Sequence, residues 1–255
     1  MSRTAKDAPG AAKGRADREA PSAGRALAEK MIRAHGGMAA WERAESVKLH
    51  MQGGGLLLAS KRQRGAMADV EVTVATTGQR TEVRPYPRPG HGGIFERGRI
   101  RIETDGGALV EERTDPRPLF RKFRRQFRWD DLDLLYFSGY ALWNYVTVPF
   151  VLLRDGYVLE AKKENVLAVT FPDGVHTHCR HQRFVLDQRG LLQRHLYTAE
   201  PVGRWARSVH VASDHREFGG LIFPTKRRVY PRSLTGGRVP FPVLVSIDID
   251  DVTVS

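Results

Sequence analysis

The fold is decided by residues 156–198, which read GYVLEAKKENVLAVTFPDGVHTHCRHQRFVLDQRGLLQRHLYT. Short runs of β-branched and apolar residues alternate here with turn residues, and the tetrad DQRG favours a hairpin. The pattern continues in WARSVHVASD (205–214), TKRRVYP (225–231) and VLVSIDID (243–250). Because strands joined by short turns must pair antiparallel, we expect a mainly β (α+β) protein built on one large antiparallel sheet.

Strand patterns also precede this region, in ADVEVTVATT (68–77) and RIRIET (99–104). Together with the later runs they predict roughly nine to eleven strands, and a sheet of that size tends to curl or close. We therefore expect a curved sheet or half-barrel.

Three helices are predicted outside residues 117–128. An N-terminal helix spans about residues 25–35 and ends at a Gly-Gly pair, and a short one follows at 38–43. The third, DLDLLYFSGYALWNYVTV (131–148), is capped by Asp130 or Asp131 and stopped by Pro149. It is apolar nearly all round, so we expect it to pack in the concave face of the sheet.

The composition fits one domain, because 255 residues with 41% hydrophobic content can bury a full core. We expect residues 1–23, rich in Ala, Gly, Arg and Lys, to form a disordered basic tail, and residues 24–255 to form a single half-barrel domain. The tail lacks the apolar run of a secretory signal, and no stretch of about eighteen apolar residues is present. A cytoplasmic protein without a transmembrane segment is therefore expected.

A single cysteine, Cys179, excludes an intramolecular disulfide and disfavours a thiolate metal site. The net charge of +12 raises the alternative of binding to an anionic surface or a nucleic acid. In residues 117–128 the aromatics Phe120, Phe123 and Phe127 have helical spacing, which predicts a surface helix with an apolar stripe beneath a basic face. No DNA-reading helix or aromatic RNA-binding signature accompanies the charge, so no specific nucleic acid is expected.

Two resemblances support this architecture. The helix followed by HGG and Trp41, and the strands around a central helix, resemble the LolA/LolB lipoprotein-carrier superfamily. That resemblance implies a half-barrel with a helical lid that holds acyl chains. More closely, GYALWNYVTVPF (139–150), FPDGVHTH (171–178), DHREF (214–218), GLIFPTKRRVYP (220–231) and LVSIDIDDV (244–252) resemble an uncharacterised bacterial family of about 250 residues, over residues 25–254. The resemblance implies a LolA-like half-barrel for the domain, but no catalytic residues.

The candidate site comes from the histidines, six of which gather between residues 176 and 215 with Asp214 and Glu217 beside them. If Gln188 and Arg189 form a two-residue turn, Gln182 lies opposite His195 and Arg180 lies opposite Tyr197. Alternate residues of a strand share a face. We therefore expect one wall, polar at one end and apolar at the other, which includes His176, His178, Arg180, Gln182, Phe184, His195 and Tyr197.

Three interpretations of this wall remain open. A metal ion is not favoured, but His176 and His178, about 6.6 Å apart along a strand, could bind one together with His195. In an enzyme, Asp214 could orient His178 or His195 for acid–base catalysis. Alternatively, the histidines are neutral sheet residues that satisfy one another by hydrogen bonding.

Our preferred hypothesis is a binding protein for an apolar or amphipathic small molecule, a lipid or a metabolite, that needs no cofactor. Tyr140 and Trp143 of the central helix are expected to touch this molecule, since their rings combine apolar area with a polar tip. We expect the same molecule to be contacted by wall residues and by His210, namely His176, Arg180, Gln182, Phe184, Tyr197 and His210. A small-molecule enzyme is the alternative, and contact with a membrane surface is compatible with both.

Overall fold

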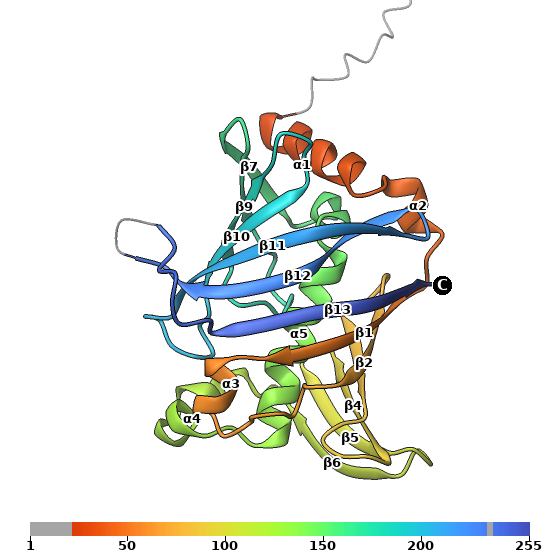
Figure 1. The fold of residues 1–255 in the computed structure, drawn as a ribbon, viewed down its shortest axis with the longest axis vertical. Coiled ribbons are helices and arrows are strands. Elements are labelled where there is room, and N and C mark those ends of the chain that lie inside the picture. The colour runs from red at the N-terminus through yellow and green to blue at the C-terminus, as the bar shows by residue number, and fades with distance from the viewer. Residues whose placement is uncertain (1–21, 234–236) are drawn as a thin grey trace, which may run out of the picture.

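The structure is a computed structural model that describes residues 22–233 and 237–255. In this part of the chain thirteen strands form one open antiparallel sheet that curves around a long helix (Figure 1). The mainly β (α+β) class is confirmed. The strand count was predicted too low, because strands such as the glycine-containing HGGIFE carry little alternation. Of the predicted basic tail, only Ser22 and Ala23 lie within the described residues, at the start of the first helix.

The sheet follows chain order except at one place. In chain order the strands are β1 (Ser46–Gly54), β2 (Val70–Ala75), β3 (Arg80–Arg84), β4 (His91–Glu96), β5 (Arg99–Thr104), β6 (Leu109–Thr114), β7 (Val158–Lys163), β8 (Val166–Thr170), β9 (His181–Leu186), β10 (Leu192–Thr198), β11 (Arg207–Phe218), β12 (Leu221–Pro231) and β13 (Val245–Val254). The last strand, β13, pairs with β1 on one side and β12 on the other. It therefore joins the β1–β6 half of the sheet to the β7–β12 half.

The helices are short apart from two. They are α1 (Ala23–Ala34), α2 (Met38–Glu42), α3 (Leu56–Ser60), the 3-10 helix η1 (Arg117–Arg121), α4 (Phe123–Phe127), α5 (Asp131–Thr147) and the 3-10 helix η2 (Phe150–Leu153). Helix α1 packs on β7 and β8, and Trp41 of α2 stacks on Phe150 at a ring-centroid distance of 4.4 Å. None of the helices in residues 22–233 and 237–255 has the length and apolar character needed to cross a bilayer.

Helix α5 packs in the concave face of the sheet, as predicted (Figure 1). Its N-terminus is a capping box in which Asp130 Oδ1 accepts from the Asp133 amide at 2.8 Å, and the Asp133 carboxylate accepts from the Asp130 amide at 3.3 Å. Sixteen of its seventeen residues are buried, and the helix packs against β2, β3, β4 and β5. Gly139 permits this contact, because a Cβ atom there would overlap the side chain of Phe95 on β4.

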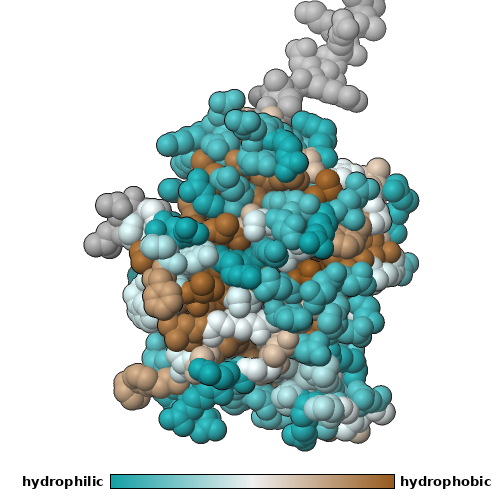
Figure 2. Space-filling view, in the orientation of Figure 1, coloured by the Kyte–Doolittle hydropathy of each residue, from teal (hydrophilic) through white to brown (hydrophobic). Residues whose placement is uncertain are grey.

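The prediction of a single helix over residues 117–128 is wrong, because the segment forms two short helices. Lys122 has an extended backbone (φ −72°, ψ 139°) and divides the segment into η1 and α4. Phe120 is consequently buried, whereas Phe123 and Phe127 of α4 are exposed and do not form a covered stripe with it. Figure 2 shows that polar side chains cover much of this face of the molecule, with apolar side chains exposed between them.

Candidate functional site

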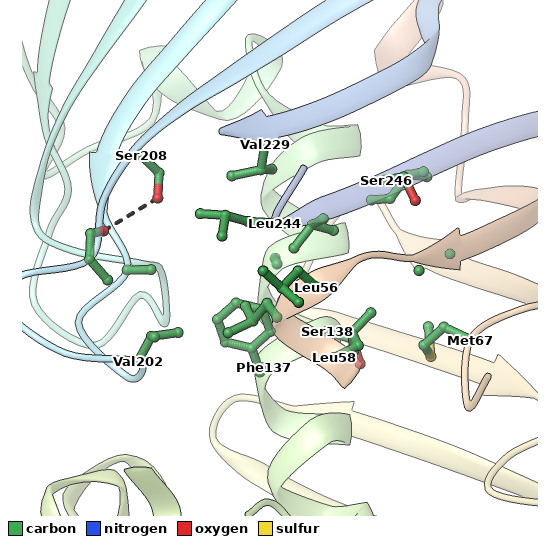
Figure 3. Close-up of a pocket in the computed structure, with 18 of the residues that line it drawn as sticks. Leu56, Leu58, Met67, Phe137, Ser138, Val202, Ser208, Val229, Leu244 and Ser246 are labelled. Atoms are coloured by element: carbon green, nitrogen blue, oxygen red, sulfur yellow. Dashed lines mark hydrogen bonds between the residues drawn. The ribbon is translucent and has the colours of Figure 1, made fainter. Parts of the chain in front are cut away.

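A cavity of about 350 Å³ lies between α5 and the half of the sheet that includes β11–β13. Its lining is almost entirely apolar and includes Leu58, Met67, Phe137, Val202, Val229 and Leu244 (Figure 3). Two other lining residues, Leu56 and Trp205, are exposed to solvent. The cavity therefore opens beside these two side chains.

One face of α5 forms the inner wall of the cavity. The lining residues Leu134, Phe137, Ser138, Ala141, Leu142 and Tyr145 recur at the i, i+3, i+4, i+7, i+8 and i+11 positions of the helix. Tyr140 and Trp143 belong to other faces and do not line the cavity. The indole N–H of Trp143 donates instead to the carbonyls of Ala75 and Gly78, at 3.1 and 2.8 Å.

The outer wall depends on the short helix α3. Gly55 precedes it with φ 118°, a conformation that favours glycine, and a Cβ atom there would overlap the carbonyl of Leu244. The amides of Leu56 and Leu57 donate to the carbonyls of Val243 and Leu244 at 3.1 and 2.9 Å. These bonds fasten α3 to the segment before β13 and hold its leucines at the cavity.

His178 lies behind this cavity, fully buried between two tyrosines. Its Nδ1 is 3.0 Å from the Tyr140 hydroxyl and its Nε2 is 2.8 Å from the Tyr145 hydroxyl. Its ring also stacks on Tyr197 at 4.0 Å. Burial, with a smaller contribution from the charge of Arg117, lowers the pKa of His178 to about 3. A neutral imidazole has one N–H and one lone pair, so one hydroxyl accepts from the ring and the other donates to it.

His195 stacks on Phe184 at 4.5 Å, and its Nε2 is hydrogen-bonded to the side-chain oxygen of Gln182. The Gln182 amide nitrogen donates to Thr177 Oγ1 at 2.5 Å and to the Cys179 carbonyl at 2.7 Å. These two acceptors fix the orientation of the Gln182 amide, so His195 Nε2 must carry the hydrogen. Burial lowers the pKa of His195 well below its usual value, and the ring is neutral.

His210 and Arg227 complete this buried layer. Neither ring nitrogen of His210 has a hydrogen-bond partner among the described residues. Arg227 donates from Nη2 to the Tyr145 carbonyl at 2.7 Å and lies over the Tyr145 ring. No carboxylate of the described residues lies within ion-pair distance of Arg227, and burial lowers its pKa to about 10. The guanidinium therefore remains charged at neutral pH and, after burial itself, helps to lower the pKa of His210.

We call His178, His195, His210, Tyr145 and Tyr197 the histidine layer. Tyr145 and Tyr197 both line the cavity, and their hydroxyl oxygens are 3.2 Å apart. The histidine layer thus lies directly behind the apolar wall, with two tyrosine rings between the imidazoles and the open volume. The arrangement offers a ligand apolar area and few polar groups.

The predicted strand register was wrong by two residues. His195 pairs with Phe184, because the β9–β10 connection is longer than two residues and the pairing shifts between Leu192 and Arg194. A shift of two keeps each side chain on its own face. Gln182, Phe184, His195 and Tyr197 are accordingly all buried on the inner side, as the predicted wall required.

Other predicted residues lie elsewhere. Residues 176–180 precede β9 and are not a strand, so alternation does not apply to them. His176 contacts the Tyr136 hydroxyl at 2.9 Å, one helical turn from the Tyr140–His178 contact, and Arg180 is exposed and paired with Asp173. Asp214 has φ 55°, is partly exposed, and pairs with Arg216 and Lys226. It does not join the histidines.

Within the part of the chain that the structure describes, no three His, Cys, Asp or Glu side chains are grouped so that they could share a metal ion. His176, His178 and His195, the set considered for a metal, have separate partners: Tyr136, the Tyr140–Tyr145 pair and Gln182. Both ring nitrogens of His178 are within hydrogen-bond distance of tyrosine hydroxyls, so this imidazole has no nitrogen left for a metal.

Sequence reasoning missed the part of the cavity that comes from α3 and from the loop at residues 199–206. A signal was present in the run GGGLLLAS, where three leucines follow three glycines, since such a run belongs to neither an amphipathic helix nor an alternating strand. Trp205 carried no signal of its own. Its position depends on how the β10–β11 loop folds over the opening.

Two solved structures are similar to this chain in fold. A DUF1329 family protein from Desulfovibrio piger has a TM-score of 0.47 at 12% identity, over 92% of this chain and 94% of its own. A LolA superfamily protein from Nitrosomonas europaea has a TM-score of 0.46 at 10% identity, over 91% of this chain and 93% of its own. No family model matches the sequence, and no curated protein is similar to it in sequence. The expected structural similarity to a LolA superfamily protein is confirmed, and at these identities it concerns the fold alone.

Proposed function

We propose that the protein binds an apolar or amphipathic small molecule, a lipid or an acyl-bearing metabolite, with the apolar part in the cavity. The observation that carries this proposal is a volume of about 350 Å³ with an almost wholly apolar lining and an opening at Leu56 and Trp205. This volume lies within the usual range of small-molecule pockets. Water gains few hydrogen bonds from such walls, whereas each methylene group buried there contributes about 0.8 kcal/mol.

The cavity is also lined by Arg207 and Arg232 and by serine hydroxyls, none of which is a general base at neutral pH, so its polar groups favour binding over acid–base chemistry. Ser208 donates to the Ala206 carbonyl and Ser138 to the Leu134 carbonyl, so both hydroxyl hydrogens are engaged within the protein. The imidazoles of the histidine layer are neutral, and no carboxylate of the described residues contacts them. The catalytic roles considered for His178, His195 and Asp214 stay a prediction that the geometry does not favour.

The test is direct binding with a matched pair of variants. Native mass spectrometry of freshly purified protein should show a retained apolar molecule. After its removal, the fluorescent fatty acid 11-dansylaminoundecanoic acid should bind, and laurate should compete with it. Ala141→Phe fills the cavity and should weaken binding at least tenfold.

Ala39→Phe is the control, because Ala39 is an exposed residue of α2. It should bind the fatty acid as the unmodified protein does. Val202→Phe, in the loop at the cavity, repeats the test if Ala141→Phe fails to fold. Absence of binding to the unmodified protein, or equal affinity in Ala141→Phe and Ala39→Phe, would rule out the cavity as the binding site.

A further inference from the structure

Large apolar side chains are exposed around the opening of the cavity. Phe123 and Phe127 of α4 are 80% and 62% exposed, Trp205 is 76% exposed, Phe241 is 79% exposed and Leu56 is 50% exposed. We call these five residues the mouth surface. Leu56 and Trp205 also line the cavity, so the mouth surface is continuous with its interior.

The residues of the mouth surface come from four segments that are fastened together. The Lys61 ammonium at the end of α3 donates to the carbonyls of Arg125 and Gln126 in α4, and the Trp129 amide donates to the Lys61 carbonyl at 3.1 Å. Helices α3 and α4 accordingly lie side by side in Figure 1. Phe241 lies two residues before Val243, whose carbonyl accepts from the Leu56 amide.

The loop that carries Trp205 adjoins the same region. A groove is lined on one side by Arg121 and Gln126 and on the other by Gly203 and Arg204, so this loop faces η1 and α4. The apolar area at the left of Figure 2, beside the position of α3, belongs to this side of the molecule. The exposed rings therefore surround one opening instead of being scattered singly over the surface.

The charges beside the mouth surface are mainly positive, although the adjoining groove also holds Asp115 and Glu200, of which Glu200 pairs with Arg117. Residues 117–128 contain six Arg and Lys residues and no Asp or Glu. Four of them, Arg121, Lys122, Arg124 and Arg128, are exposed and form no ion pair with any described residue, and the same is true of Arg204. Exposed aromatic rings with unpaired cations beside them match the interface of an anionic bilayer, where rings enter the headgroup region and cations meet lipid phosphates.

We propose that the mouth surface docks on an anionic lipid bilayer, so that the cavity opens toward the membrane. The rings of Phe123, Phe127, Trp205 and Phe241 enter the interface, and the basic residues of 117–128 lie over the headgroups. A molecule that leaves the membrane for the cavity then crosses little water. Docking needs no ligand in the cavity, so it can be tested apart from the function proposed above.

Vesicle binding tests this proposal on the full chain. Vesicles of phosphatidylcholine with 30% phosphatidylglycerol should sediment the protein, and vesicles of phosphatidylcholine alone should not. Binding should weaken at least tenfold between 50 mM and 500 mM NaCl. Trp205 provides a second readout, because Trp41, Trp129 and Trp143 are buried. Tryptophan emission should shift to shorter wavelength with anionic vesicles only, and this shift should disappear in Trp205→Phe.

Three variants separate the contributions. Phe123→Ser with Phe127→Ser should lower the partition coefficient at least tenfold, and Arg121→Gln with Lys122→Gln and Arg124→Gln should do the same at low salt. The control is Leu109→Ser with Val110→Ser, which removes two exposed apolar side chains of β6 and should leave binding unchanged. Ala141→Phe should also bind vesicles normally, which keeps docking distinct from loading of the cavity.

Three outcomes would overturn the proposal: no sedimentation with anionic vesicles, equal sedimentation with both kinds of vesicle, or a loss of vesicle binding in the β6 control as large as in the Phe123 and Phe127 variant. Analytical ultracentrifugation addresses another occupant of the same surface. If the protein does not bind vesicles but forms a dimer that the Phe123 and Phe127 substitutions abolish, the occupant of the mouth surface is a second copy of the chain and not a bilayer.

Discussion

Arg227 donates from Nη2 to the main-chain carbonyl of Tyr145 at 2.7 Å, and this bond replaces one that α5 cannot make itself. The residue four positions later is Pro149, which has no N–H to offer that carbonyl. A guanidinium at the C-terminal end of α5 also interacts favourably with the negative end of the helix dipole. A basic side chain from β12 therefore caps the C-terminus of the helix that lies in the concave face of the sheet.

Replacing this cation should destabilise the protein. In Arg227→Met the buried Tyr145 carbonyl loses its donor, and we expect the free energy of unfolding to fall by about 2 kcal/mol. Chemical denaturation measures the change. Arg228→Met is the control, because Arg228 pairs with Asp248 on the more exposed face of the same strand and should cost no more than about 1 kcal/mol. Equal losses in the two variants would contradict the role assigned to Arg227.

Stability should depend on pH through the buried histidines. The pKa of His178 is about 3 in the folded state and near 6.5 when unfolded, so between these values the unfolded chain binds a proton that the folded protein does not. Stability due to this residue is therefore lost as the pH falls below about 6.5, by about 1.4 kcal/mol per pH unit. His35, His195 and His210, whose pKa values are also lowered by burial, act in the same direction.

The substitution His178→Gln isolates one of these contributions. Its free energy of unfolding should be measured by urea denaturation between pH 4 and 7. The slope against pH should correspond to about one proton fewer taken up on unfolding than in the unmodified protein. An unchanged slope in His178→Gln would mean that this imidazole titrates in the folded state.

The two tyrosine hydroxyls of the histidine layer should differ in their effect. Tyr145→Phe leaves His178 Nε2 buried without its partner and should cost about 2 kcal/mol. In Tyr197→Phe the Tyr145 hydroxyl keeps its bond to His178, so the cost should be about 0.5–1 kcal/mol. Thermal unfolding of both variants under one condition gives the comparison. A greater loss of stability in Tyr197→Phe would show that the bond between the two hydroxyls matters more than the bond from Tyr145 to His178.

Substitution of Gly139 by alanine should destabilise the protein, although alanine has the higher helix propensity. Alanine is the better helix former by about 1 kcal/mol, but its Cβ would overlap Phe95, and α5 would have to move away from β4. We expect Gly139→Ala to lower the free energy of unfolding by at least about 2 kcal/mol. Ser138→Ala, one position earlier in the same helix, should change it by less than about 1 kcal/mol. A stabilised Gly139→Ala protein would show that the sheet does not approach the helix this closely.

The fold was predictable because its main signals are local. The apolar circumference of residues 131–148, the Asp cap and Pro149 define α5 within one sequence window, and the alternating runs define most strands. The site was only partly predictable. Gln182, Phe184, His195 and Tyr197 could be assigned to one face because a register error of two residues preserves faces.

The rest of the site depends on segments brought together across the fold. His178 lies outside regular strand structure, and its position is fixed by hydrogen bonds with two tyrosines of α5. Asp214 is close in sequence to the histidines, yet its backbone at φ 55° and its ion pairs hold it away from them. Which face of α5 meets the cavity is set by the packing of β2–β5 on the opposite side, and periodicity in an evenly apolar helix cannot indicate it.

The position of β13 has a consequence for synthesis. This strand follows all the others in the chain, yet both β1 and β12 depend on it for their second partner. Until β13 is synthesised, the nascent polypeptide contains two separate parts of the sheet, whose edges at β1 and β12 are unpaired and open to misassociation. The two parts of the sheet can join only after β13 has left the ribosome, so chaperone protection of those edges is most valuable before that point.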